Sequence, residues 1–209
     1  MRTPSSLIKS SFLSHNFVSN YKSLYMRETK NDDLDLKKCK MDLGVDFKFE
    51  KKCFEYFNHV DYAPDSWKIN VYTDGSAYSN GQEGAKGGYG VFFGCKEYAQ
   101  LSLRFSLPHT EKQTNNVAEL MAIRDAIQVS SVISYIAEIC IYSDSKYSID
   151  VITKKKKSHA NKELVVQIQK LIKSCKLKVQ LVHVPAHTGK NDIHSVGNSI
   201  ADYLASTTW

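Results

Sequence analysis

Four acidic residues stand where a sequence can build a metal site: Asp74, Glu119, Asp144 and Asp202. Asp74 follows the alternating β-prone run at 71–73, and Asp144 follows a continuous apolar run. Glu119 and Asp202 fall in segments with helical apolar spacing. Ligands of open α/β sheets gather at the carboxyl ends of strands, and neighbouring strands are about 4.8 Å apart. If the two strands are parallel neighbours, Asp74 and Asp144 can reach one ion.

Such a carboxylate group favours a cation, because like charges at short range repel and otherwise take up protons. An all-oxygen set without a cysteine or histidine cluster indicates Mg²⁺ or Mn²⁺. Two such ions about 4 Å apart would stabilise both the attacking and the leaving oxygen in phosphodiester cleavage. Each acid alone also fits a turn, a helix terminus or a solvated surface. Their joint placement favours the metal site.

The elements that must position these acids begin near residue 67. Alternating or apolar runs predict strands, and apolar residues at helical spacing predict helices. The expected strands are 68–74, 87–94, 98–105, 137–144 and 178–184. The expected helices are 115–129, a short one near 145–153, 161–175 and 195–206. Short connections join the first three strands as an antiparallel meander, so the order predicts an α/β fold with a mixed sheet flanked by helices.

Composition narrows the class of protein. The 209 residues are 42% hydrophobic, which is enough for a core. No apolar run reaches the roughly 20 residues that span a bilayer, so a soluble protein without membrane association is expected. Five cysteines without a CxxC pair argue against a disulfide framework or structural zinc. This favours an intracellular and cytoplasmic protein, with a nuclear or mitochondrial location as the alternatives.

Charge is unevenly distributed in this chain, whose net charge is +6. Residues 154–178 hold nine lysines against one glutamate, which suits a phosphate backbone or an ordinary solvated face. Residues 1–27 hold seven serines, four basic residues and no acid, as in a mitochondrial transit peptide or a disordered basic tail. Residues 28–66 either pack on the main domain or form a linker. We therefore expect an N-terminal extension, 1–66, and a main domain, 67–209.

Six segments occur in an order that resembles type 1 ribonuclease H over about residues 67–206: YTDGSAYSNG, GAKGGYGVFFG, QTNNVAEL, IYSDSKYSI, ANKEL and HVPAHTG…GNSIADYLA. The resemblance implies the ribonuclease H-like fold, with a five-stranded sheet made of the meander plus two parallel strands. It implies a hydrolase, an endonuclease that cuts the RNA strand of RNA–DNA hybrids and leaves 5′-phosphate and 3′-hydroxyl ends. Two Mg²⁺ ions, or Mn²⁺ in their place, would be the cofactors.

The same matching assigns roles to single residues. Asp74, Glu119, Asp144 and Asp202 take the places of the four metal-binding carboxylates. His187 in VPAHTG matches the family's mobile histidine, which assists product or metal departure or proton transfer; the loop after it is several residues longer than usual. His183 and His194 lie nearby in sequence and are interpreted as structural or solvated.

Substrate contacts also follow from the resemblance. A turn against the RNA strand would contain Gly75, Ser76, Asn80 and Gly81. Contacts in the minor groove would come from Asn115 and Asn116. A pocket for a DNA phosphate would contain Lys112, Thr114 and Asn161. Because 2′-hydroxyls and phosphates carry no base identity, little sequence preference is expected. The asparagines also fit turn and N-cap roles.

One departure concerns the tryptophan-bearing basic helix, or handle, of many family members. Here the corresponding gap is TKKKKSHA, where Lys154, Lys155, Lys156 and Lys157 form a basic patch without tryptophan. The chain thus resembles handle-less members, and we expect weak, salt-dependent hybrid binding. No hybrid-binding module is recognised before residue 67. A monomer is expected. It would bind the hybrid through its own lysines or with the help of an accessory protein or polymerase.

Two alternatives stay open at the level of sequence. One is a catalytically inactive module that binds hybrids or RNA, although such a module has no reason to retain mutually repelling acids. The other is a related nuclease that acts on DNA or on double-stranded RNA, since a fold alone does not define a substrate.

Overall fold

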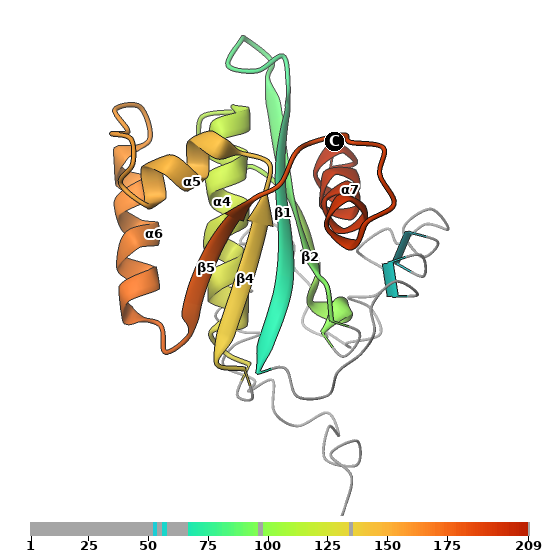
Figure 1. The fold of residues 1–209 in the computed structure, drawn as a ribbon. Helices are drawn as coiled ribbons and strands as arrows, with labels where there is room; N and C mark the ends of the chain where they lie inside the picture. The colour runs from blue at the N-terminus through green and yellow to red at the C-terminus, as the bar shows by residue number, and fades with distance from the viewer. Residues whose placement is uncertain (1–51, 54–55, 58–66, 96–97, 134–135, 209) are drawn as a thin grey trace, which may run out of the picture. The chain divides into compact units, whose positions relative to one another are not determined.

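The computed structural model describes residues 52–53, 56–57, 67–95, 98–133 and 136–208, all within one compact unit, residues 40–209 (Figure 1). The expectations for the basic tail at 1–27 lie outside the described residues, as do most of those for 28–66. In the described part of the chain, no helix has both the length and the apolar character that a membrane crossing requires.

A five-stranded mixed sheet forms the centre of the fold, in the order β3-β2-β1-β4-β5. Its strands are β1 (Lys68–Tyr78), β2 (Lys86–Phe93), β3 (Leu103–Ser106), β4 (Glu138–Ser143) and β5 (Lys178–His183). Strands β1, β2 and β3 pair antiparallel, whereas β4 pairs parallel with both β1 and β5. The predicted meander plus two parallel strands is confirmed.

Helices cover both faces of this sheet (Figure 1). They are α4 (Asn115–Ser130), α5 (Lys146–Ile152), α6 (Lys162–Ser174) and α7 (Ile193–Ser206). Alternate strand residues face opposite ways, and this separates the two sides of β1. On one side Gly75 lies against α4, whereas on the other the Tyr72 ring lies against Gly197 of α7. Helix α4 is buried almost all round because it packs between the sheet and α6.

Strand β1 is longer than predicted. The sequence placed its end at Asp74, followed by a turn, but the strand continues to Tyr78. The reason is its second neighbour, since β2 pairs with β1 as far as Tyr78 and Lys86. The parallel ladder with β4 stops earlier, at the pair Thr73 and Ser143. Asp74 therefore lies inside a strand, but directly beyond the last residue that β4 can pair.

The predicted third strand, 98–105, is wrong in its first half. A short 3-10 helix, η2 (Ala99–Leu101), replaces it, and β3 begins only at Leu103. The cause is Ser102, whose backbone N–H closes a turn onto Ala99 and whose hydroxyl accepts a hydrogen bond from the backbone of Phe93. The backbone N–H groups of Ser102 and Phe93 are thus used in a turn and in a bond to a side chain, and are not available for pairing in a longer strand.

Residues before Trp67 contribute to the core. The Tyr56 side chain is fully buried and packs edge-on against Phe92 at 5.0 Å between ring centroids. Its hydroxyl shares a 3.1 Å hydrogen bond with the Tyr72 hydroxyl. Burial raises the pKa of Tyr56 to about 12. A methyl group added to Gly94 would lie 2.3 Å from the Tyr56 hydroxyl oxygen, so the tyrosine occupies a closely fitted site.

Replacing Tyr56 should therefore destabilise the whole unit. Tyr56→Ala should lower the free energy of unfolding by about 3–5 kcal/mol, because it leaves a large cavity. Tyr56→Phe should cost about 1 kcal/mol, since it removes only the hydroxyl and its hydrogen bonds with the Tyr72 hydroxyl and the Gly94 carbonyl. The matched control is Trp67→Ala, where a side chain that is 69% exposed should change stability by less than about 0.5 kcal/mol. Urea unfolding measures all three, and equal losses for Tyr56→Ala and Trp67→Ala would contradict the packing role.

Candidate active site

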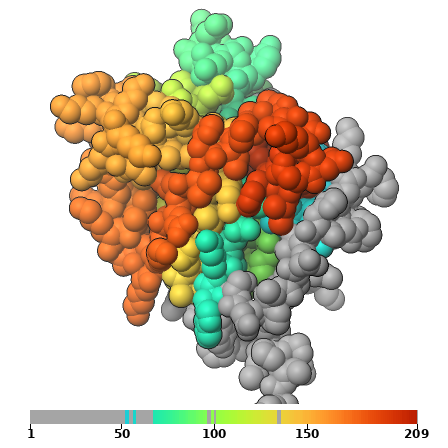
Figure 2. All heavy atoms as spheres, in the orientation of Figure 1, coloured from blue at the N-terminus to red at the C-terminus, as the bar shows by residue number. Residues whose placement is uncertain are grey.

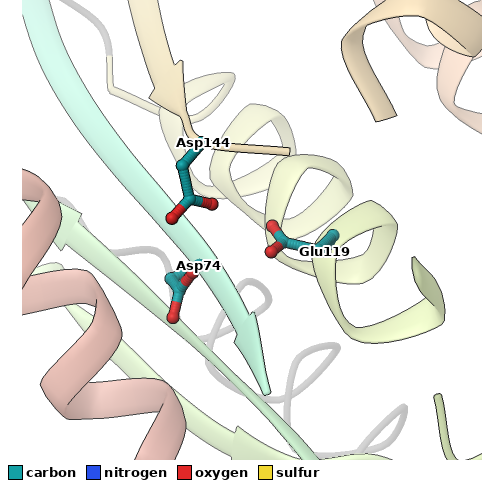
Figure 3. A group of neighbouring side chains, drawn as sticks. All are labelled: Asp74, Glu119 and Asp144. Carbon is teal, nitrogen blue, oxygen red and sulfur yellow. The ribbon is translucent and has the colours of Figure 1, made fainter. Parts of the chain in front are cut away.

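Three acids converge at the carboxyl end of β4 (Figure 3). Asp74 comes from β1, Asp144 directly follows β4, and Glu119 comes from the second turn of α4. One carboxylate oxygen from each lies within 4.8 Å of the others. The parallel register explains the first two positions, because Asp74 and Asp144 each follow the last paired residue.

Gly75 allows Glu119 to approach. A Cβ at this position would lie 2.2 Å from the Glu119 backbone nitrogen, so only glycine lets α4 pack this closely on β1. The backbone N–H of Gly75 also donates hydrogen bonds that lower the pKa of both Asp74 and Glu119. The sequence placed Gly75 in a turn that contacts RNA; the structure places it in a strand and gives it this packing role.

Burial and mutual repulsion oppose ionisation of the group. Asp74 is 6% exposed, and its pKa is raised to about 8, first by burial and then by the charges of Asp144 and Asp202. Glu119 is 7% exposed, and burial raises its pKa well above the usual value, with Asp74 and Asp144 adding to the shift. At neutral pH the isolated group therefore retains protons that a cation would displace.

The donors present fit a hard divalent cation. The three residues offer carboxylate oxygens alone, which suits Mg²⁺ or Mn²⁺. Among the described residues, Oε2 of Glu119 is buried without a hydrogen-bond partner. A buried carboxylate oxygen without a partner is costly, and a bound cation would satisfy it. The three acids could therefore hold a metal ion.

Asp202, the fourth acid, is near this group but outside it. It lies in α7, the helix that covers the same face of β1 as Tyr72. Asp74 also points to this face, because it lies two residues beyond Tyr72 in the strand. The negative charge of Asp202 accordingly raises the pKa of Asp74. The structure thus brings Asp202 beside the group through its interaction with Asp74.

Two residues that hold the acids were missed at the level of sequence. Ser143 is fully buried and donates a side-chain hydrogen bond that lowers the pKa of Glu119. Asn198 is 4% exposed, and its Nδ2 donates to Oδ2 of Asp144 at 3.4 Å. A signal for Asn198 was available, since it precedes Asp202 by four residues and so shares its helix face.

The histidines occupy different surroundings. His187 is exposed, in the loop between β5 and α7, with a φ of 48°; it is not in the three-acid group. Nε2 of His183 lies 3.2 Å from the backbone carbonyl oxygen of Asp144. His194 stacks on Tyr142 at 4.2 Å, with Nδ1 3.2 Å from the Tyr72 hydroxyl. Burial lowers the pKa of His194.

The predicted RNA contacts are divided between β1 and the turn that follows it. Ser76 lies within β1, whereas Asn80 and Gly81 lie in the turn that projects at one end of the sheet (Figures 1 and 2). This turn is tied to the start of α4. Oδ1 of Asn80 accepts from the backbone N–H of Asn115 at 3.1 Å, and the N–H of Gly81 donates to Gln113 at 3.0 Å. The structure thus joins two of the proposed contact regions.

The remaining candidates lie at the starts of α4 and α6. Lys112 and Asn116 are exposed, and Thr114 is the N-cap of α4, accepting from Val117. Nδ2 of Asn161 donates to the Tyr147 hydroxyl at 3.1 Å. Lys154 to Lys157 are exposed in the connection between α5 and α6, part of the orange corner of the surface in Figure 2.

A sheet of this order, with helices on both faces and carboxylates beyond the β1–β4 ladder, defines the ribonuclease H-like fold. The fold is shared with LC11-RNase H1, crystallised with an RNA/DNA hybrid. The TM-score is 0.53 at 23% identity, covering 67% of this chain and 95% of that one. Residues 66–209 match the family RNase H. The chain belongs to this family.

Curated relatives agree with this assignment. The chain is 32% identical over 152 residues to "Probable ribonuclease H" of Acanthamoeba polyphaga mimivirus, covering 63% of this chain and 62% of that protein. It is 34% identical over 150 residues to "Ribonuclease H1" of Mus musculus, covering 66% and 48%. It is 32% identical over 135 residues to "Ribonuclease H" of Clostridium botulinum, covering 58% and 85%. The chain thus spans about half to two thirds of the first two relatives.

The raised pKa values predict that the metal-free protein loses stability as pH rises. Between the unfolded pKa near 4 and the folded pKa of about 8 for Asp74, the native state binds more protons than the unfolded state. The free energy of unfolding should therefore fall over this window, by a few kcal/mol, since one pKa unit corresponds to about 1.4 kcal/mol. Asp74→Asn should make the fall smaller.

Thermal unfolding with a chelator, from pH 5 to pH 9, measures this effect. The control is Asp150→Asn, a carboxylate of α5 outside the group, which should keep the wild-type pH dependence. An Asp74→Asn protein with the same pH dependence as wild type would contradict the assignment of the fall to Asp74.

Proposed function

We propose that this chain is an endonuclease that hydrolyses the RNA strand of RNA–DNA hybrids with divalent metal ions, leaving 5′-phosphate and 3′-hydroxyl ends. The observation that carries the proposal is the three-acid group, whose oxygens lie within 4.8 Å of one another. Membership of the RNase H family supports the substrate, as does the hybrid bound by LC11-RNase H1.

The proposed metal ligands are Asp74, Glu119, Asp144 and Asp202, which would hold two Mg²⁺ ions, or Mn²⁺ in their place. When bound, these ions supply charge stabilisation to the attacking and leaving oxygens of the phosphodiester. Ser143 and Asn198 orient two of the carboxylates. His187 lies on an exposed loop from which it would assist product departure or proton transfer.

The proposed substrate surface lies at the end of the sheet that holds the acids. The turn after β1 and the start of α4 are hydrogen-bonded to each other, so they would contact the RNA strand and the minor groove as one unit. Lys112, Thr114 and Asn161 would hold a DNA phosphate. Such contacts read shape and 2′-hydroxyls rather than bases, which implies little sequence preference.

We also propose that the domain, residues 67–209, is a handle-less variant that acts as a monomer. Helix α5 ends at Ile152 and α6 begins at Lys162, and the connection between them contains lysines but no tryptophan. Charge therefore replaces aromatic stacking on the DNA strand. Contacts between lysines and phosphates weaken as the salt concentration rises, whereas the stacking of bases on aromatic rings is not an ion pair. Binding by this surface therefore depends strongly on ionic strength.

Matched hybrid, RNA duplex and DNA duplex of one sequence, incubated with Mg²⁺, test the activity. The RNA strand of the hybrid should be cut, and the two other duplexes should be cut far more slowly. Asp144→Asn should lower the rate more than about 100-fold, because losing a ligand costs more than losing an outer partner, which costs 10–100-fold. Asp150→Asn is the matched control and should keep the wild-type rate.

Two outcomes contradict the proposal. Equal cleavage of the RNA duplex would overturn the substrate, and full activity of Asp144→Asn would overturn the metal assignment.

A second test concerns the basic patch Lys154 to Lys157. Replacing all four lysines with alanine should raise KM for the hybrid and leave kcat near its wild-type value. The dependence of log K on log salt should also become shallower, by up to about 0.9 for each phosphate that the variant no longer neutralises. Hybrid binding measured between about 50 and 200 mM salt reports the slope.

The control for this test removes three other exposed lysines, Lys170, Lys173 and Lys176, by the same change to alanine. It should alter KM and the slope less than the patch does. Equal effects of both variants would show that net charge, and not the position of the patch, decides binding.

A further inference from the structure

Asn198 and Ser199 are adjacent polar residues of α7 whose side chains form hydrogen bonds in different directions. The Ser199 hydroxyl donates to the backbone of its own helix, at Val196. Asn198 instead reaches across to the segment after β4, where its Nδ2 donates to Oδ2 of Asp144 at 3.4 Å. Its side chain is therefore directed toward the acidic group and not toward its own helix.

The other half of the same amide has no protein partner. Asn198 is 4% exposed, and among the described residues its Oδ1 is buried without a hydrogen-bond donor. The second such atom in this part of the chain is Oε2 of Glu119. Buried polar atoms in folded proteins are satisfied by protein, water or an ion. Two buried oxygens without partners beside one carboxylate group indicate that a bound ion or water satisfies them in the functional protein.

Oε2 of Glu119 and Oδ1 of Asn198 require different binding partners. The Glu119 oxygen is a carboxylate and can bind a cation directly. The Asn198 oxygen is a neutral acceptor and needs a group that donates a hydrogen. Mg²⁺ retains several of its waters when proteins bind it, and such waters donate strongly. A hydrated cation in the acidic group would therefore satisfy both atoms.

We propose that Asn198 is a positioning residue of the metal site, whose Nδ2 holds Asp144 and whose Oδ1 accepts a hydrogen bond from a water of the hydrated cation. This inference rests on the proposed function, because it presumes the cation. Asparagine suits the position since one side chain provides both a donor and an acceptor without charge. Leucine has nearly the same shape and provides neither.

Mn²⁺ binding to the 209-residue chain, measured by titration calorimetry, tests the proposal without a measurement of catalysis. Asn198→Leu should weaken Mn²⁺ binding at least about tenfold, the effect expected for an outer partner of a ligand. Asn198→Asp, which retains an acceptor oxygen, should bind more tightly than the leucine variant at pH 8. The matched control is Ser199→Ala, the next residue of α7, which should bind Mn²⁺ as wild type does.

Thermal unfolding separates this role from a purely structural one. Without metal, Asn198→Leu should unfold at or above the wild-type temperature, because it removes an unsatisfied acceptor. With Mn²⁺, wild type should gain more stability than the variant. A leucine variant that is less stable without metal but binds Mn²⁺ within twofold of wild type would show a structural role and overturn the proposal. An aspartate variant no better than leucine would overturn the part played by Oδ1.

Failure of this inference is distinguishable from failure of the proposed function. If wild type cleaves the hybrid while Asn198→Leu binds Mn²⁺ as tightly, the inference is wrong and the function stands. If Mn²⁺ binding depends on Asn198 but the hybrid stays intact, the inference stands and the function is wrong. A wild-type protein that binds no Mn²⁺ at millimolar concentration overturns both.

Discussion

Repulsion between buried carboxylates is the constraint around which this structure is arranged. Asp74 and Glu119 are almost fully buried and interact with Asp144. Free side chains would separate or become neutral, but here the backbone holds them together. Because the sheet and α4 set these positions, the strain is relieved only by protons or by a cation. The raised pKa of Asp74 and the buried Glu119 oxygen without a hydrogen-bond partner both result from this close packing of acids.

The central position of β1 makes such an arrangement possible. It pairs with β4 on one edge and β2 on the other, and the two ladders have different lengths. Where the β4 ladder ends, Asp74 still has a regular strand conformation imposed by β2, whereas Asp144 is free to leave the sheet. Gly75 then permits the close approach of α4, and α7 adds Asp202 and Asn198 from the opposite face. Each contribution depends on long-range packing against β1.

The same face of the sheet is stabilised by a segment that precedes all of the site residues in sequence. Tyr56 packs beneath α7 with Phe92 and with Tyr72, which lies two residues before Asp74 in β1. Lys52 donates a hydrogen bond to Ser199, the neighbour of Asn198. Residues that precede the matched family region, 66–209, thus support the strand and the helix that carry site residues.

The sequence alone determined the order of elements and the mixed sheet, because hydrophobic periodicity is a local property that can be read without coordinates. It also singled out Asp74, Glu119 and Asp144, which the structure brings together. It did not reveal that β1 continues past Asp74, since that depends on pairing with a strand that comes later in the chain. Nor did it reveal the 3-10 helix at Ala99–Leu101, which a buried serine imposes. The roles of Ser143 and Asn198 were decided by tertiary structure for the same reason. A polar residue in a strand or helix has no evident partner until packing brings a carboxylate to it.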